Sequence, residues 1–161
     1  MAGSTRMIRR TSLALGLAAL GGAAFAYVRY APMDPEDWHA DPEEGVRTGN
    51  PNDHLMGPGG DRAPLRLDLP PAEVMARLDV AAMVEPGVER LAGDVGAGHV
   101  TYVQRTRLMG YPDAISVKAS PEGTGTRLSI WSRSRFGKSD FGVNRARVDR
   151  WLAAAGLDAD A

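Results

Sequence analysis

Residues 131–150 read WSRSRFGKSDFGVNRARVDR, and this stretch changes its pattern twice. It first continues a strand-like run, then passes through a turn between Gly137 and Gly142, and restarts as a basic helix. Ser139 or Asp140 can cap that helix, because the first N–H groups of a helix have no partner inside it. The stretch therefore predicts a strand-to-helix corner on which the rest of the fold depends.

The elements on either side of the corner each have one apolar face. The helix is predicted to run to about Ala155 and to stop at Gly156. Its apolar stripe consists of Val148, Trp151, Leu152 and Ala155. In the strand before the corner, residues 126–133, Leu128 and Ile130 share one face. The opposite face carries Arg127, Ser129, Trp131 and Arg133.

The chain upstream supplies the remainder of a domain over residues 64–157, followed by a tail at 158–161. Residues 65–69 alternate as a strand does, and Pro70-Pro71 then opens a helix that runs to about Val84. Further strands are predicted at residues 88–91, 99–108, 115–119 and 126–133. Val100, Tyr102 and Leu108 are expected on one face of the second of these. Short connections predict an α+β fold: an antiparallel sheet of about four to five strands, covered on one face by two helices.

The composition excludes several classes of protein. The net charge is −1 over 161 residues, so the chain lacks the basic field of a nucleic-acid-binding protein, and no nucleic-acid partner is expected. It contains no cysteine, which excludes disulfides, thiolate nucleophiles and cysteine zinc sites. The basic residues are nevertheless concentrated near the corner: Arg127, Arg133, Arg135, Lys138, Arg145, Arg147 and Arg150.

The N-terminus predicts attachment to a membrane, in addition to the fold above. A basic flank at residues 1–10 precedes an uncharged, mostly apolar run at 11–28, which as a helix spans about 27 Å. Ala24-Phe25-Ala26 has the spacing of a signal-peptidase site. The aromatic and basic edge at residues 27–30 instead favours a retained single-pass anchor. The basic flank then predicts an extracytoplasmic C-terminal domain, periplasmic in a Gram-negative bacterium.

Residues 29–63 are rich in proline, glycine and acidic side chains, and they predict an extended linker that carries the domain off the membrane. The acidic residues are Asp34, Glu36, Asp37, Asp41, Glu43 and Glu44. With His39 they offer ligands for a cation, but their spacing matches no defined coordination loop, so a solvated linker without metal or cofactor is expected. Trp38 is expected to fold back onto the domain, because burial of its ring stabilises by about 2–3 kcal/mol.

Two interpretations of the corner stay open. It can be an anion or partner site, in which the helix N-terminus and nearby cations hold a phosphate or carboxylate. The cations of that site are Arg133, Arg135, Lys138 and Arg145. Alternatively, and in our preferred interpretation, Asp140 itself supplies the anion and pairs with Arg135 or Arg145 as an internal clamp.

A hydrolase site at the corner is disfavoured. Ser139 and Asp140 would need a base, and His39, His54 and His99 have no spacing that singles one out. No catalytic residue is therefore assigned.

Small and polar residues recur at fixed spacing through the corner, and we expect them to have structural roles. They are Ser132, Ser134, Gly137, Ser139, Asp140, Gly142, Asn144 and Arg147. Together with Arg135 they resemble the C-terminal signature of the domain of unknown function 1499 family (DUF 1499). Many members carry an arginine at the position of Trp131, and a Pro-Asn-Cys segment where this chain has Asn50-Pro51-Asn52-Asp53. The resemblance implies a membrane-associated or exported protein of bacteria or plastids, without an established activity.

The expected function is a non-enzymatic binding or assembly module of the cell envelope. Its expected partners are the membrane, through the N-terminal helix, and either anionic lipid or an envelope protein. The alternative is a binding protein or enzyme for a small phosphorylated or carboxylated compound.

Overall fold

The structure is a computed structural model that describes residues 2–47 and 49–158, with side chains from residue 16 onward. Arg6, Arg9 and Arg10 of the predicted basic flank therefore lie outside the described side chains, as do residues 159–161 of the predicted tail.

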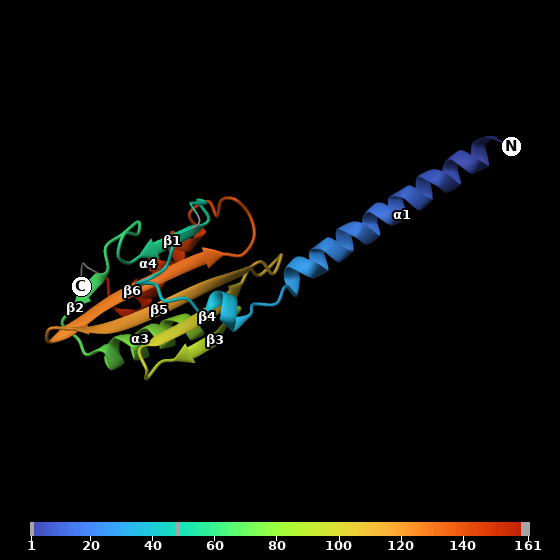
Figure 1. Ribbon diagram of the computed structural model, residues 1–161. Helices are drawn as coiled ribbons and strands as arrows, with labels where there is room; N and C mark the ends of the chain where they lie inside the picture. The colour runs from blue at the N-terminus through green and yellow to red at the C-terminus, as the bar shows by residue number, and fades with distance from the viewer. Residues whose placement is uncertain (1, 48, 159–161) are drawn as a thin grey trace.

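A six-stranded antiparallel sheet forms the centre of the domain (Figure 1). Its order is β1-β6-β5-β4-β3, and β2 pairs with the remaining length of β6. The strands are β1 (Asp53–Met56), β2 (Leu65–Leu67), β3 (Val88–Asp94), β4 (His99–Arg105), β5 (Pro112–Glu122) and β6 (Gly125–Ser134). The predicted antiparallel α+β fold is confirmed. The sheet is one strand larger than expected, because β1 comes from residues that were assigned to the linker.

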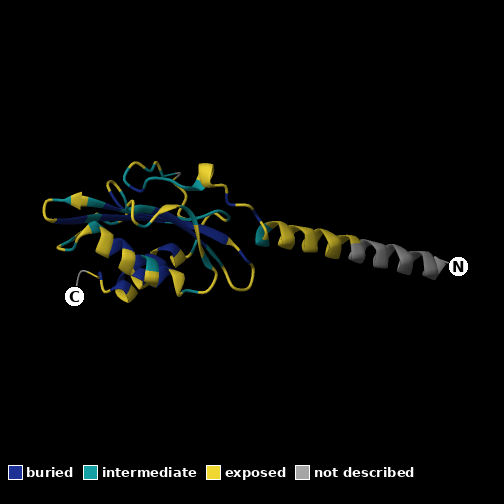
Figure 2. Cartoon of the chain, turned by 90° about the horizontal axis from the view of Figure 1, so that it is seen from below, coloured by how far each residue is buried: buried dark blue, intermediate teal, exposed yellow. Residues whose placement is uncertain are grey.

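Two helices, α3 (Pro71–Met83) and α4 (Val143–Ala155), cover one face of the sheet (Figure 2). Their buried sides form the core with the inward side chains of the strands, including Ile115, Leu128 and Ile130. Tyr102 of β4 meets Trp151 of α4 edge to face at 5.4 Å between ring centroids. The predicted apolar stripe of α4 is buried, and the helix ends at Gly156 as expected.

Residues 31–62 cover much of the opposite face of the sheet, which corrects the prediction of an extended linker. Asp41 pairs with Lys118, and Glu43 binds Arg127 at 2.8 Å. His39 Nδ1 lies 2.8 Å from the hydroxyl of Thr101. The segment is bound because its carboxylates meet the cations that project from β5 and β6. Breaker density alone cannot reveal that charge match, so the folded domain begins well before residue 64.

The strand β4 also ends earlier than predicted. Thr106 N–H donates to Tyr111 O, and Gly110 N–H donates to Thr106 O, so the chain turns at this point. Leu108 is left 81% exposed in that turn and does not share the buried face of Val100 and Tyr102. The composition of residues 106–108 suits a strand, but the turn's hydrogen bonds determine where the strand ends.

The helix α1 (Ala2–Arg29) projects from the domain, and a short helix α2 (Pro35–Trp38) follows it (Figure 1). Among the described residues, no helix has both the length and the apolar character that a membrane span requires.

Candidate functional site

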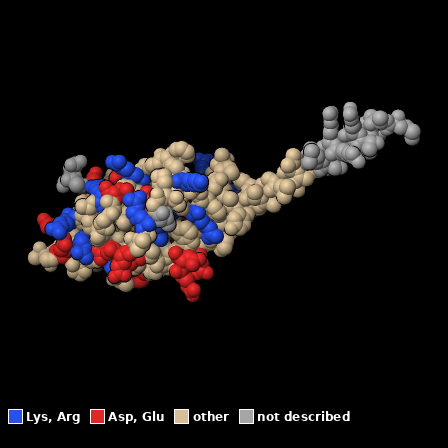
Figure 3. Space-filling view, turned by 45° about the horizontal axis from the view of Figure 1, so that its top comes forward, with Lys and Arg blue, Asp and Glu red and all other residues tan. Residues whose placement is uncertain are grey.

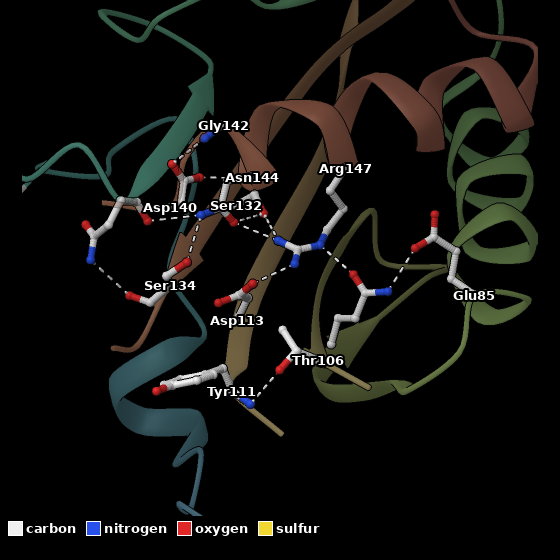
Figure 4. Close-up of polar contacts among 12 residues, drawn as sticks. Glu85, Thr106, Tyr111, Asp113, Ser132, Ser134, Asp140, Gly142, Asn144 and Arg147 are labelled. Carbon is white, nitrogen blue, oxygen red and sulfur yellow. Dashed lines mark hydrogen bonds and ion pairs between the residues drawn. The ribbon is translucent and has the colours of Figure 1, made fainter. Parts of the chain in front are cut away.

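The strand-to-helix corner contains a buried network centred on Arg147 (Figure 4). Arg147 Nη2 donates to Asp113 Oδ2 at 2.6 Å, and its Nη1 donates to Asn144 Oδ1 at 2.7 Å and Ser132 Oγ at 2.9 Å. Its Nε donates to the side chain of Gln104. Every nitrogen of this guanidinium is therefore engaged within the protein, and the charge is matched by a buried carboxylate.

Asn144 extends the network to the edge of the sheet. Its amide nitrogen donates to Asn52 O at 3.0 Å and Ser134 Oγ at 2.9 Å, while its oxygen accepts from Ser132 Oγ at 2.6 Å. These bonds fix the start of α4 against β6 and against the chain entering β1. Ser132, Ser134, Asn144 and Arg147 thus lie together, and they are joined by Asp113 and Gln104, to which no role was assigned from the sequence.

Asp140 occupies the N-terminus of α4. Its carboxylate accepts hydrogen bonds from Gly142 N–H at 3.0 Å and Asn144 N–H at 2.8 Å. A carboxylate at this position satisfies the unpaired N–H groups and the positive end of the helix dipole. The expected partners Arg135 and Arg145 do not pair with it, however. The ion pair that joins strand to helix is Asp113–Arg147 instead.

The four cations of the predicted anion site are separated in the structure. Arg145 is exposed on α4 and lies 3.8 Å from Asp149, one turn further along the helix. Lys138 is exposed in the turn before α4. Arg133 and Arg135 alone line a common pocket of about 400 Å³ at the end of β6.

The walls of this pocket come from three parts of the chain that are distant in sequence. Trp38 and Asp37 belong to α2, Asn50, Asn52 and Asp53 precede or begin β1, and Trp131, Arg133, Arg135 and Gly137 belong to the corner. Gly45 lies against the Trp131 ring, since a Cβ atom at that residue would be 2.3 Å from it. Residues 31–62, which we call the covering segment, thus form the wall of the pocket that faces β6.

Arg133 is the principal cation of the pocket. Its guanidinium carbon lies 4.3 Å from the centroid of the Trp131 ring and 5.6 Å from that of Trp38. Its Nη2 donates to Trp38 O at 2.7 Å and Ser116 Oγ at 3.0 Å. Cation–π contacts of this kind stabilise by up to about 2 kcal/mol when the cation is shielded from water.

The charge of Arg133 is not neutralised by any carboxylate that the structure describes, because none lies within 4.0 Å. Its Nε is buried and has no hydrogen-bond partner among the described atoms. Asp53 is turned to Arg47 Nη2 at 2.6 Å and Trp131 Nε1 at 2.8 Å. Burial lowers the pKa of Arg133 to about 10, with Asp53 opposing this shift, so the group stays cationic at neutral pH.

The three histidines make contacts with residues other than Ser139. His39 and His99 stack at 4.2 Å between ring centroids, and His54 Nδ1 lies 3.5 Å from Asp61. The Ser139 hydroxyl accepts from Phe141 N–H, and no hydrogen bond joins it to a histidine in the described structure. Nor do the described residues include a group of three or more histidine and carboxylate side chains that could hold a metal ion.

The fold and the site together define a small α+β domain that places a half-buried arginine, with no described carboxylate within 4.0 Å, in an aromatic pocket. The family model described as "Protein of unknown function (DUF1499)" matches residues 37–154. The chain belongs to this DUF1499 family, which confirms the resemblance seen in the corner.

Solved structures that are similar to this chain at low identity include the following two. Protein CV1439 from Chromobacterium violaceum is 15% identical, with a TM-score of 0.42, over 66% of this chain and 94% of that chain. The protein TTHA0849 from Thermus thermophilus is 14% identical, with a TM-score of 0.30, over 65% of this chain and 89% of that chain. No curated protein matches the chain.

Proposed function

We propose that this protein is a membrane-attached, non-enzymatic binding module of the cell envelope, which takes a carboxylate or phosphate group in the Arg133 pocket. The observation that carries the proposal is the half-buried Arg133 in the pocket wall, whose buried Nε has no hydrogen-bond partner and whose charge has no described carboxylate within 4.0 Å. A buried charge that lacks a counter-ion is unfavourable, so an anion that enters the pocket gains a partner that the protein itself does not provide.

The pocket also supplies selectivity for such a group. A guanidinium presents paired N–H donors that match carboxylate and phosphate oxygens. Arg135 lines the same pocket and adds a second cation, while Trp38 and Trp131 offer apolar surface to the remainder of a ligand. We expect a ligand with one anionic group and an apolar or planar body.

The membrane attachment is supported by the uncharged run at residues 11–28 and the basic residues before it. An extracytoplasmic location follows from the same charge bias. We propose the membrane attachment and the extracytoplasmic location together with the ligand site.

A thermal-shift screen of the full chain with millimolar phosphate, citrate, glucose 6-phosphate and benzoate tests the binding. A ligand present at ten times its Kd stabilises the folded state by about 1.4 kcal/mol. Trp38 and Trp131 line the pocket, so their fluorescence reports on occupancy directly.

Arg133→Gln should abolish the shift, while the matched variant Arg145→Gln, outside the pocket, should retain it. Circular dichroism would establish that both variants fold. An equal ligand response in the two variants, or no response of the unmodified chain to any of the compounds, would rule out the pocket as an anion site.

A further inference from the structure

The connections at one end of the sheet form a single surface. In the antiparallel register, the start of β3 pairs with the end of β4, and the start of β5 pairs with the ends of β4 and β6. The chain segments at this end are therefore residues 84–87, 106–111 and 135–142. The C-terminus of α1 is held at the same end (Figure 1). We call this surface the α1-proximal end.

The helix α1 is bound directly to this end, without a spacer. Arg105 donates hydrogen bonds to Arg29 O at 3.1 Å and Ala31 O at 2.9 Å, and Arg29 donates to Leu108 O at 3.4 Å. Gly110, at φ 72°, allows this contact, because a Cβ atom there would lie 2.8 Å from the Arg29 side chain. The domain therefore stays next to α1 instead of being carried away from it by a linker.

Large apolar side chains protrude from the α1-proximal end. Phe141 is 95% exposed, Leu108 81% and Val84 74%, and Tyr30 beside them is 75% exposed. Phe141 also has a positive φ of 53°, an uncommon conformation for a bulky residue. An exposed apolar residue is ordinary when it is isolated, but several on one surface indicate a contact with an apolar or interfacial phase.

Five of the described cations lie at this end: Arg29, Arg105, Arg107, Arg135 and Lys138. No described carboxylate lies within 4.0 Å of any of these five side chains. Elsewhere the basic side chains that the structure describes are ion-paired, except Arg133: Arg47, Arg62, Arg66, Arg77, Arg90, Lys118, Arg127, Arg145, Arg147 and Arg150. Figure 3 shows basic side chains across this face of the domain, some of them on the side towards α1, and acidic groups along the lower edge.

Two hollows lie beside each other at the base of α1. One, of about 460 Å³, is lined by Arg29, Arg105 and Arg107. The other, of about 510 Å³, is lined by the apolar side chains Val28, Phe136 and Phe141 and also by Asp113 and Asp140, whose carboxylates are already engaged with Arg147 and the start of α4. A basic hollow next to an apolar one matches the two chemical parts of a phospholipid.

We infer that the α1-proximal end lies on a bilayer that contains anionic lipid. Leu108 and Phe141 enter the interface, and the exposed cations Arg107 and Lys138 contact lipid phosphates. This inference rests on the proposed attachment through α1. Amphipathic surfaces bind at the interface through apolar insertion combined with attraction to anionic headgroups. The acidic residues Asp34, Glu36 and Asp37 near α2 oppose that attraction, so we expect them at the margin of the contact.

The absence of cysteine allows a direct test on the full chain. Single variants Leu108→Cys and Phe141→Cys are labelled with a polarity-sensitive fluorophore and reconstituted in vesicles of equal parts phosphatidylcholine and phosphatidylglycerol. Thr124→Cys, in the exposed turn at the opposite end of the sheet, is the matched control. Leu17→Cys reports on α1. A lipid that carries a quencher is added to each sample.

We expect blue-shifted emission and quenching at residues 17, 108 and 141, and neither change at 124. Quenching at 17 with residues 108 and 141 behaving like 124 would overturn the inference while leaving the attachment of α1 intact. No quenching at 17 would overturn the attachment and the inference together. Equal quenching at 108 and 141 in pure phosphatidylcholine vesicles would overturn the role of anionic lipid.

Discussion

Arg133 of β6 and Arg147 of α4 lie in consecutive elements and have opposite environments. Arg147 is buried among Asp113, Asn144 and Ser132 and has a carboxylate at 2.6 Å. Arg133 stacks on Trp131 and has none within 4.0 Å among the described residues. Arg147 is committed to holding the corner together, whereas Arg133 is the cation of the proposed ligand site.

Asp113→Asn tests the structural role of Arg147, the partner of Asp113. The substitution preserves the shape of the side chain but leaves the Arg147 charge buried without its partner. We expect a loss of about 3–5 kcal/mol in the free energy of unfolding, measured by urea denaturation. Arg145→Gln, on the exposed side of the same helix, should change it by less than about 0.5 kcal/mol. A loss below that of the control would show that the corner does not depend on this ion pair.

At the scale of elements, the segment at residues 31–62 has the largest effect on the interpretation. It turns one polar face of the sheet into an interior, so that Thr101 and Ser116 are fully buried although both are polar. Burial would raise the pKa of Glu43, but the hydrogen bond from Arg127 and its charge outweigh this and lower it. Those contacts show that the segment is bound by electrostatic attraction as well as by packing.

His39 in this segment should make stability depend on pH. Burial, followed by the charges of His99 and Arg133, lowers its pKa from 6.5, so the unfolded chain binds a proton more readily than the folded one. Stability should therefore fall as the pH decreases below 6.5 towards the pKa of the folded state. The same direction holds for His54, whose pKa is lowered first by burial.

Urea denaturation between about pH 8 and pH 5 measures this effect, since the carboxylates begin to titrate only at lower pH. His39→Gln should weaken the dependence of the free energy of unfolding on pH. His54→Gln should remove the part of that dependence that comes from His54. An unchanged slope in His39→Gln would contradict the assignment.

For the whole molecule, the sheet has two covered faces, by helices on one side and by the N-terminal segment on the other. Removal of residues 1–29 should leave a domain that unfolds cooperatively, because the covering segment is retained. Removal of residues 1–52 should abolish the cooperative transition, because it uncovers Trp131 and the buried polar groups beneath the segment. Thermal unfolding followed by circular dichroism distinguishes these outcomes. A cooperative transition in the shorter chain would show that the segment is dispensable.

Much of the fold could be predicted from local pattern. The alternation of Leu128 and Ile130 with Arg127 and Ser129 indicated both faces of β6, and the apolar stripe of α4 with Gly156 indicated the helix and its end. These features depend on the period of the backbone, which fixes the direction of each side chain regardless of what lies opposite.

The partners of those side chains were decided by the tertiary structure. Arg133 donates to the carbonyl of Trp38, which is 95 residues away, and Arg127 binds Glu43, which is 84 residues away. The pairing of β1 with β6 is likewise a contact between distant segments. The sequence by itself determined which residues are basic, which face of β6 they occupy and where α3 and α4 end. Only the packed chain decided that Asp113 neutralises Arg147 and that no described carboxylate reaches Arg133, because charge pairing depends on distances that arise after the elements pack.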